Sequence, residues 1–288
     1  MKKILVTGAY GQLGSEMKVI SAQYPQYHFI FTDVDTLDIC NETTLNNFFE
    51  INKVDFIVNC AAYTAVDKAE DDFDKAYLIN KEAVRLLGQS ATKIGAKIIH
   101  VSTDYVFDGT SYLPYTEDMK ICPQTVYGKS KAEGENELFK ACKNAVIVRT
   151  SWLYSSFGNN FVKTMMKLGA EKEKLTVIFD QIGTPTYAAD LATAIMKIVS
   201  AETFVPGIFH FSNEGVCSWY DFTISIHKAA NIKTCKVLPI ESKDYPVRTP
   251  RPHYSVLNKM KIKSTYHFEI PHWEDGLLRC MSILKKAN

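Results

Sequence analysis

The first half of the chain alternates between two hydrophobic patterns. Short, nearly continuous apolar runs are typical of strands buried on both faces, whereas apolar residues three and four positions apart are typical of amphipathic helices. The pattern predicts strands over residues 3–7, 28–32, 55–61, 97–102 and 145–150, and helices over residues 14–22, 43–52, 72–94 and 126–143.

Strands that alternate with helices at this interval indicate βαβ units and a parallel sheet with helices on both faces. We therefore predict an α/β fold in which residues 1–150 form a Rossmann-type, doubly wound parallel sheet that binds a dinucleotide. Residues 151–288 are predicted to be mainly a smaller C-terminal substrate-binding domain. Within them, elements at about 188–212 are expected to return to the sheet.

The regular alternation of strand and helix patterns ends after residue 150. Residues 151–160 are polar, aromatic and glycine-containing, which predicts a loop. Asp190 is expected to be the N-cap of a helix, because a short carboxylate accepts hydrogen bonds from the first free N–H groups. Further on, the pattern predicts a strand over 208–211, a helix over 219–230 and, from three prolines, an irregular segment over 246–252.

Composition and charge narrow the class of protein. The 288 residues carry 33 basic and 32 acidic side chains, a net charge of +1, so no electrostatic argument favours nucleic acid or a membrane surface as a partner. A hydrophobic content of 46% with 23% charged residues excludes intrinsic disorder. The seven cysteines have no paired spacing, which argues against zinc ribbons and a disulfide framework. With no signal-peptide core and no bilayer-length apolar run, we expect a cytoplasmic protein.

A glycine-rich turn follows the first predicted strand and opens the first predicted helix. Gly8, Gly11 and Gly14 are spaced G-x-x-G-x-x-G. Such a turn lets the backbone approach a pyrophosphate without Cβ atoms, and the helix N-terminus presents free N–H groups to the phosphates. The position of the turn, at the first strand-to-helix connection, predicts a dinucleotide-binding site.

An acidic residue lies at the spacing expected for the adenosine ribose. Asp33 ends the second predicted strand, 19 residues after Gly14, and would hydrogen-bond the ribose hydroxyls. Its carboxylate would repel a 2′-phosphate, and residues 19–52 contain no Lys or Arg. We therefore predict that NADH is accepted at least as well as NADPH. Asp38 and Ile39 are expected to cover the adenine edge.

A tyrosine and a lysine one helical turn apart supply candidate acid–base chemistry. Tyr127 and Lys131 lie on one face of the helix predicted from residue 126, and a nearby ammonium is expected to lower the pKa of the phenol towards working pH. Thr103 and Asp104 close the fourth predicted strand, whose carboxyl end faces the ligand crevice. The Thr103 hydroxyl is expected to hold a substrate carbonyl oxygen opposite Tyr127.

These motifs resemble the extended short-chain dehydrogenase/reductase superfamily and, within it, the dTDP-4-dehydrorhamnose reductase family. The resemblance runs from about residue 3 to 275. It is carried by residues 58–70 (VNCAAYTAVDKAE), 102–107 (STDYVF), 127–129 (YGK), 149–154 (RTSWLY) and 158–161 (GNNF), and by Arg251-Pro252 with Ser255 and Leu257.

The resemblance implies reduction of the C4 ketone of dTDP-4-dehydro-L-rhamnose with NADH or NADPH, in the biosynthesis of a polysaccharide precursor. Tyr127 would be the proton donor, Lys131 would tune it and bind the cofactor, and Thr103, Asp104 and Trp152 would contact the sugar. Arg251 would meet the diphosphate. Trp152 has an alternative role as a core aromatic, and Arg251 as a solvated loop residue. The residues implied to line the cofactor are Gly11, Gln12, Leu13, Asp33, Asp38, Ile39, Ala62, Tyr63 and Thr64.

Two other functions remain open from the sequence. One is another sugar-nucleotide enzyme, a different reductase or an epimerase, which would retain its dinucleotide through the cycle. The other is a regulatory relative without turnover, which the presence of Thr103, Tyr127 and Lys131 argues against.

The resemblance also raises the question of Mg²⁺, around which some family members dimerise through glutamates. Glu16 matches the first of these by position, but residues 187–191 offer only Asp190. The tail offers Glu274 and Asp275 and then turns basic. Mg²⁺ requires several oxygen ligands in near-octahedral geometry. We therefore predict no Mg²⁺ at this site and a monomer or weak homodimer.

Overall fold

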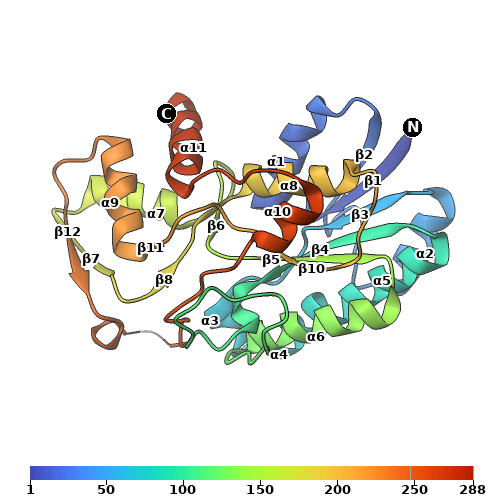
Figure 1. Ribbon diagram of the computed structural model, residues 1–288, viewed down its shortest axis with the longest axis horizontal. Helices are drawn as coiled ribbons and strands as arrows, with labels where there is room; N and C mark the ends of the chain where they lie inside the picture. The colour runs from blue at the N-terminus through green and yellow to red at the C-terminus, as the bar shows by residue number, and fades with distance from the viewer. Residues whose placement is uncertain (247, 288) are drawn as a thin grey trace.

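Six parallel strands form the central sheet, in the order β10–β5–β4–β3–β1–β2 (Figure 1). The computed structural model describes residues 1–246 and 248–287. The predicted fold class, a doubly wound α/β sheet of Rossmann type, is confirmed. The strands of this sheet are β1 (Lys2–Thr7), β2 (Tyr27–Thr32), β3 (Phe56–Asn59), β4 (Lys97–Thr103), β5 (Ala145–Thr150) and β10 (Gly207–His210).

The strand order places a ligand crevice at the end of β1. The chain runs outward from β1 to β2 and then returns past β1 to β3, so the connections leave the two neighbouring strands in opposite directions. Ligands of open α/β sheets bind at the carboxyl ends of the strands where the order reverses in this way. Thr7 and Asn59 end these two strands and pair in register.

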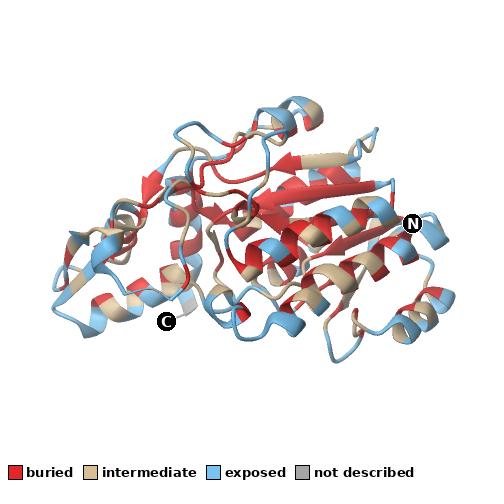
Figure 2. Ribbon diagram, turned by 90° about the horizontal axis from the view of Figure 1, so that it is seen from below, coloured by how far each residue is buried: buried red, intermediate tan, exposed pale blue. Residues whose placement is uncertain are grey.

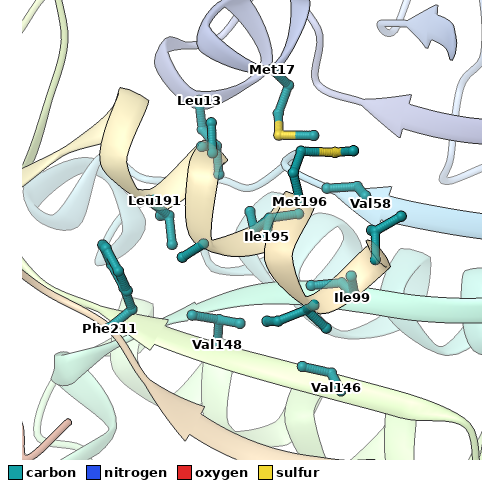
Figure 3. Packing of buried hydrophobic residues seen from close by; sticks show 14 of the residues in the cluster. Leu13, Met17, Val58, Ile99, Val146, Val148, Leu191, Ile195, Met196 and Phe211 are labelled. Carbon is teal, nitrogen blue, oxygen red and sulfur yellow. The ribbon is translucent and has the colours of Figure 1, made fainter. Parts of the chain in front are cut away.

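One face of the sheet is covered by α1 (Gln12–Ile20), α8 (Ala188–Ser200) and α10 (Met260–Tyr266). Figure 3 shows Leu191 and Ile195 of α8 directed onto Val148 of the sheet, with Leu13 and Met17 of α1 beside them. Each fully buried aliphatic side chain of this kind contributes about 1.5–3 kcal/mol to the free energy of folding. This core fixes the start of α1, and with it the glycine turn, against the sheet.

The opposite face is covered by α2 (Glu42–Ile51), α5 (Ala83–Ile94) and α6 (Val126–Ala141). Leu5 and Ile57 point to this face, whereas their neighbours Val6 and Val58 point to the other. Both faces of the inner strands are therefore buried, as Figure 2 shows along most of their length. This explains why the strands read as continuous apolar runs.

A smaller unit lies beside the sheet and contains α7 (Phe161–Glu171), α9 (Trp219–Ala230) and α11 (Trp273–Ala287) (Figure 1). Of the helices described, none combines the length and apolar composition needed to cross a lipid bilayer. The strands of the smaller unit form three short pairs: β7 (Lys174–Ile178) with β12 (Lys236–Ile240), β8 (Ile182–Gly183) with β11 (Cys217–Ser218), and β6 (Leu153–Tyr154) with β9 (Thr186–Tyr187).

The chain passes between the two units more than once. After β9 it re-enters the first unit to form α8 and β10, and it returns again for α10 before ending in α11. The remaining elements are short: α3 (Val66–Ala69), α4 (Phe73–Tyr77) and the single turns η1 (Ser21–Gln23), η3 (Asp104–Val106) and η4 (Ser242–Asp244).

Two of the predicted elements differ from the structure. The helix predicted over 72–94 is interrupted by a π-helical segment, η2 (Leu78–Glu82), because Asn80 turns inward there to bind backbone and side-chain groups of its neighbours. The loop predicted over 151–160 contains the two-residue strand β6. The segment 246–252, which was predicted to be irregular, contains no helix or strand among its described residues; residue 247 lies outside them.

Asp190 is not a helix N-cap. The cap of α8 is Tyr187, because strand β9 stays extended up to that residue. Asp190 lies in the first turn, where the positive end of the helix dipole favours an acid. Its carboxylate accepts hydrogen bonds from Asn213 and Arg279, both at 2.7 Å.

Candidate active site

The glycine turn is closed by packing at two of its glycines and open at the third. Gly8 has φ +67°, and a Cβ there would lie 2.6 Å from the backbone nitrogen of Ala61. A Cβ at Gly14 would lie 2.2 Å from the carbonyl oxygen of Gly8. At Gly11 that same oxygen, 3.3 Å away, is the one neighbour within 4 Å among the described atoms. The open side faces the N-terminus of α1, which fits a diphosphate.

A cavity of about 270 Å³ adjoins this turn, and we call it the loop cavity. The carboxylate of Asp33 at its edge accepts hydrogen bonds from the backbone N–H groups of Tyr10 at 2.8 Å and Val34 at 2.9 Å. Among the described lining residues there is no Lys or Arg. The cavity is lined by Gly8, Gly11, Asp33, Val34, Leu37, Asp38, Ile39, Cys40, Cys60, Ala61, Ala62 and Ile79.

A second cavity, the central cavity, has a volume of about 450 Å³ and shares Gly11, Cys60 and Ala62 with the loop cavity. The two cavities are therefore adjacent at the glycine turn. The central cavity brings together most of the predicted site residues: Gly11, Gln12, Leu13, Ala62, Thr64, Thr103, Asp104, Tyr127, Lys131 and Trp152.

Two residues predicted to bind the cofactor lie elsewhere. Gly14 is packed against Gly8 and Ala9 and lines neither cavity. The phenol of Tyr63 donates to Asp72 at 2.9 Å, so its side chain is directed along the surface and not into the central cavity. Its neighbours Ala62 and Thr64 do line that cavity.

Tyr127 and Thr103 face each other from α6 and the end of β4. The helix begins after Thr125, whose hydroxyl accepts a hydrogen bond from the N–H of Gly128 at 3.0 Å, and this cap fixes the turn that carries Tyr127. Burial raises the pKa of Tyr127 to about 12; the Thr103 hydroxyl acts in the opposite direction, and the charge of Asp104 adds to the rise. The phenol is therefore protonated at neutral pH.

This state of Tyr127 corrects the expectation that Lys131 lowers the pKa of the phenol. Lys131 is 1% exposed, and its Nζ donates to the carbonyl oxygen of Val101 at 2.7 Å. It also lies 3.2 Å from Nε2 of His100. Burial lowers the pKa of Lys131 to about 8, against the opposing charge of Glu135. The amine is held by Val101 on β4, and Lys131 is not among the groups that shift the pKa of Tyr127, which burial dominates.

Asp104 lines the central cavity and has one buried carboxyl oxygen without a partner. Its Oδ1 accepts a hydrogen bond from the Thr103 hydroxyl at 2.9 Å, whereas Oδ2 is buried and has no partner among the described residues. Burial raises the pKa of Asp104 to about 7, so near neutral pH this carboxyl carries a proton for part of the time. An unpartnered buried carboxyl oxygen is costly unless a ligand completes its hydrogen bonding.

Asn80 holds the cavity wall together, and the sequence analysis missed it. Its side chain accepts from the N–H of Tyr63 at 2.9 Å and donates to the carbonyl of the same residue at 3.0 Å. It also donates to the hydroxyl of Ser130 at 3.0 Å, which in turn donates to the carbonyl oxygen of Tyr127. Asn80 thus joins the 62–64 loop to the helix of Tyr127 and Lys131. A polar residue inside the apolar face of a predicted helix was the available signal.

A third cavity, the outer cavity, has a volume of about 410 Å³ and shares Tyr105, Trp152 and Trp219 with the central cavity. The rings of Trp152 and Trp219 stack at the junction. Trp219 was also missed, because its position at the start of a helix gives no sign of a cavity. The remaining wall of the outer cavity includes Phe161, Met165, Thr176, Gln181, Arg248 and Arg251.

The two arginines of the outer cavity are paired with acids. Arg251 donates to the carboxylate of Asp67 at 2.7 Å, and Arg248 forms an ion pair with Asp71. These pairs connect the segment after residue 246 to the short helix α3 and to the residues that follow it. Two guanidinium groups at one mouth of a cavity suit a diphosphate, because guanidinium donors match phosphate oxygens in pairs.

The residues at the candidate Mg²⁺ position do not fit a metal ion. Glu16 is buried, and its carboxylate accepts a hydrogen bond from Ser155 at 2.6 Å. Burial raises the pKa of Glu16, and the nearby charge of Asp190 adds to the rise. Asp190 is engaged on both oxygens by the guanidinium of Arg279 at 2.7 Å. A cation therefore already neutralises the second acid.

Comparisons with known proteins agree with this geometry. A profile of the family described as RmlD substrate binding domain matches residues 1–286. The chain is 42% identical to the spore coat polysaccharide biosynthesis protein SpsK of Bacillus subtilis, over 96% of each chain. It is 40% identical to a dTDP-4-dehydrorhamnose reductase of Aggregatibacter actinomycetemcomitans, over 96% of this chain and 97% of the relative. The crystal structure of a Bacillus anthracis dTDP-4-dehydrorhamnose reductase in complex with NADP superposes with a TM-score of 0.93, at 39% identity, over 98% of this chain and all of that one.

Proposed function

The chain belongs to the RmlD substrate binding domain family, and on that premise we propose that it is an NAD(P)H-dependent oxidoreductase that reduces the C4 ketone of dTDP-4-dehydro-L-rhamnose to dTDP-L-rhamnose. The observation that carries the proposal is the row of three adjacent cavities, which share lining residues. The glycine turn lies at one end, a cluster of Thr103, Tyr127 and Lys131 lies in the middle, and two arginines lie at the other end. A dinucleotide and a sugar nucleotide would meet in the middle of this row.

The loop cavity and the glycine turn suit the dinucleotide. Gly11 and Gln12 at the start of α1 would hold its diphosphate, and Asp33 would hold the adenosine ribose. Lys131, which lines the central cavity, would bond the ribose next to the nicotinamide. When bound, the reduced nicotinamide supplies the hydride.

The proton comes from Tyr127. Ketone reduction adds a hydride to the carbon and a proton to the oxygen, and a buried phenol with a pKa of about 12 starts in the required protonated form. The hydroxyl of Thr103, beside the phenol, would donate a hydrogen bond to the ketone oxygen and so hold it opposite Tyr127. Asp104, which lines the central cavity, would bond a neighbouring sugar hydroxyl.

The outer cavity suits the nucleotide part of the substrate. The stacked indoles of Trp152 and Trp219 and the ring of Phe161 offer apolar surface for a sugar and a base. Arg251 and Arg248 would exchange their carboxylate partners for the diphosphate. The seven cysteines are all free thiols, which suits a reducing compartment, so we place the reaction in the cytoplasm.

The test is oxidation of NADH and NADPH against a panel of 4-keto-6-deoxysugar nucleotides that differ in base and sugar. We expect turnover with dTDP-4-dehydro-L-rhamnose and at least tenfold lower kcat/KM when the base or the sugar is changed. Equal turnover across the panel would overturn the substrate assignment. Purified protein that carries stoichiometric, non-exchanging dinucleotide would instead indicate an epimerase.

A further inference from the structure

The segment that leads into α7 of the smaller unit is bound to α1 at two positions one helical turn apart. The hydroxyl of Ser155 donates to the carboxylate of Glu16 at 2.6 Å. The side-chain nitrogen of Asn160 donates to Oε1 of Gln12 at 3.0 Å. Between these contacts Gly158, with φ +61°, passes so close that a Cβ there would lie 3.1 Å from Cγ of Gln12. The smaller unit therefore contacts the end of α1 that follows the glycine turn.

The orientation of the Asn160 amide follows from its backbone partners. Its Nδ2 lies 2.7 Å from the carbonyl oxygen of Ser155 and 3.3 Å from that of Phe157. Its Oδ1 accepts a hydrogen bond from the backbone nitrogen of Lys163 at 3.2 Å and so caps α7. Backbone carbonyl oxygens only accept and a backbone N–H only donates, so the nitrogen and oxygen of this amide cannot be exchanged.

The fixed amide of Asn160 determines how the side chain of Gln12 is turned. Because Nδ2 of Asn160 can only donate, the Gln12 atom that faces it is the carbonyl oxygen Oε1. The amide nitrogen of Gln12 is the other branch of the same group and has no hydrogen-bond partner among the described residues. Gln12 is the first residue of α1 and lines the central cavity. Its two N–H donors are therefore left for a ligand, whereas its acceptor is engaged.

A diphosphate is the ligand that these donors suit. Its ionised oxygens only accept hydrogen bonds, and the free backbone N–H groups at the start of α1 favour negative charge at the same place. The open side of Gly11 lies next to Gln12. A Gln12 amide turned the other way would place its oxygen against the phosphate oxygens, an acceptor against an acceptor. An amide that is already fixed with its donors free avoids this contact and loses less conformational freedom on binding.

We propose that Asn160 is a positioning residue that turns the side-chain amide of Gln12 so that its N–H groups meet the diphosphate of the dinucleotide. This inference deepens the proposed function and rests on it for the binding of a dinucleotide at the glycine turn. The smaller unit then contributes to the affinity for the cofactor through Gln12, although the glycine turn belongs to the unit that contains the sheet. The identity of the sugar does not enter the argument.

Two single variants and their combination test the coupling between these residues. Gln12→Met keeps the aliphatic stem that Gly158 covers and removes both donors, so the Kd for NADH should rise about tenfold. Asn160→Ser keeps a hydroxyl that can cap α7 and removes the bond to Gln12, so the Kd should rise about threefold to tenfold. In the Gln12→Met background the same Asn160→Ser change should raise the Kd by less than about twofold, because the residue through which it acts is gone.

The readout is the change in NADH fluorescence on binding, measured without any sugar nucleotide. Competition with ADP, which keeps a diphosphate, should show the same pattern among the variants. Competition with adenosine, which has no phosphate, should give the same Kd in all proteins. Asn159→Ser is the matched control, because Asn159 is exposed, lines the same cavity and makes no hydrogen bond to Gln12. The control variant should bind NADH as the wild type does.

Three results would overturn the proposal. One is an effect of Asn160→Ser that persists in full in the Gln12→Met background, because Asn160 would then act through its own segment. Another is a wild-type Kd for NADH in Gln12→Met, a test that stands even if Asn160→Ser fails to fold. The third is a loss of affinity for adenosine as large as that for NADH. Titrations as expected without turnover of the sugar nucleotide would support this inference and refute only the proposed substrate.

Discussion

The indole rings of Trp152 and Trp219 stack face to face, with centroids 3.5 Å apart and planes inclined by 10°, at the junction of the central and outer cavities. Trp152 has φ +48°, a conformation that bulky residues rarely adopt. A Cβ at Gly183 would lie 2.6 Å from its ring. The surroundings therefore impose this conformation on Trp152, as is common where a side chain must meet a ligand.

Removal of this stack should weaken binding of the sugar nucleotide. We expect Trp219→Ala to raise KM for the substrate about tenfold or more, because an aromatic surface and its stacking partner are lost. The affinity for the dinucleotide should stay the same. Steady-state kinetics and cofactor titration measure the two effects. Trp273→Phe is the control, because Trp273 lines none of the three cavities, and it should leave both values near wild type.

Loss of the Tyr127 hydroxyl should remove the proton donor and little else. Tyr127→Phe keeps the ring that packs against Tyr105 at a centroid distance of 5.4 Å. We expect kcat to fall by roughly 10²–10⁴-fold, the usual contribution of a positioned general acid, with nearly unchanged affinity for both ligands. Single-turnover kinetics with binding titrations check this. A kcat close to wild type would refute the role of Tyr127.

The buried carboxyl of Asp104 should make stability depend on pH. Its pKa is about 7 in the folded protein against 3.8 for an exposed aspartate, so between these values the folded state holds a proton that the unfolded chain has released. The free energy of unfolding should therefore fall as pH rises through this range, by on the order of 2–4 kcal/mol. Asp104→Asn should remove this slope.

Urea unfolding at about pH 5 and about pH 7.5 measures the slope. Asp108→Asn is the matched control, because hydrogen bonds from Thr110 and Tyr115 lower the pKa of Asp108. The contribution of Asp108 to the free energy of unfolding is complete at neutral pH and is lost only in acid. The Asp108→Asn variant should therefore keep the wild-type dependence of this free energy on pH. An unchanged slope in Asp104→Asn would contradict the assignment.

The loop cavity should accept NADH at least as well as NADPH. Asp33 lies at its edge, and no described lining residue is a cation that could bind a 2′-phosphate. We expect Asp33→Asn to raise the ratio of kcat/KM for NADPH to that for NADH by about tenfold. Asp35→Asn is the control, because Asp35 does not line this cavity. A wild-type preference of tenfold or more for NADPH would overturn this prediction.

Chelation should leave the oligomeric state unchanged. Asp190 is held by Arg279 and the Glu16 carboxylate by Ser155, so these acids are not free to share a divalent cation. Sedimentation velocity with EDTA and with added Mg²⁺ should give the same species, which we predict to be a monomer or weak homodimer. A dimer that dissociates on chelation and forms again with Mg²⁺ would show the prediction to be wrong.

The parts of the fold that could be predicted are those set by local pattern. The strands of the sheet and the glycine turn follow from apolar runs and from backbone close approach, and helix α9 begins and ends as its apolar pattern indicates. The start of α8 could not be predicted, because the role of Asp190 depends on Arg279, 89 residues away. The π-helical turn at Asn80 likewise depends on a tertiary bond to Ser130.

The same distinction applies to the site. Thr103, Tyr127 and Lys131 could be grouped from spacing and from the rule that strand ends face the crevice. Their pKa values could not be predicted from the sequence, because the direction in which Nζ of Lys131 points depends on Val101 and His100 on another element. His100 also looked like an ordinary strand residue, since its partners Asn59 and Lys131 become neighbours only in the folded sheet.

The return of the chain for α8 and β10 has a consequence for how the protein is made. While a nascent chain leaves the ribosome, β5 keeps an unpaired edge until residues 207–210 have emerged. The sheet face beneath α8 stays uncovered until residues 188–200 have emerged, more than 170 positions after the glycine turn. An open strand edge and a bare apolar face favour association with other chains. A translation product that stops near residue 150 would therefore be prone to aggregate. The sheet is complete only after most of the protein has been synthesised.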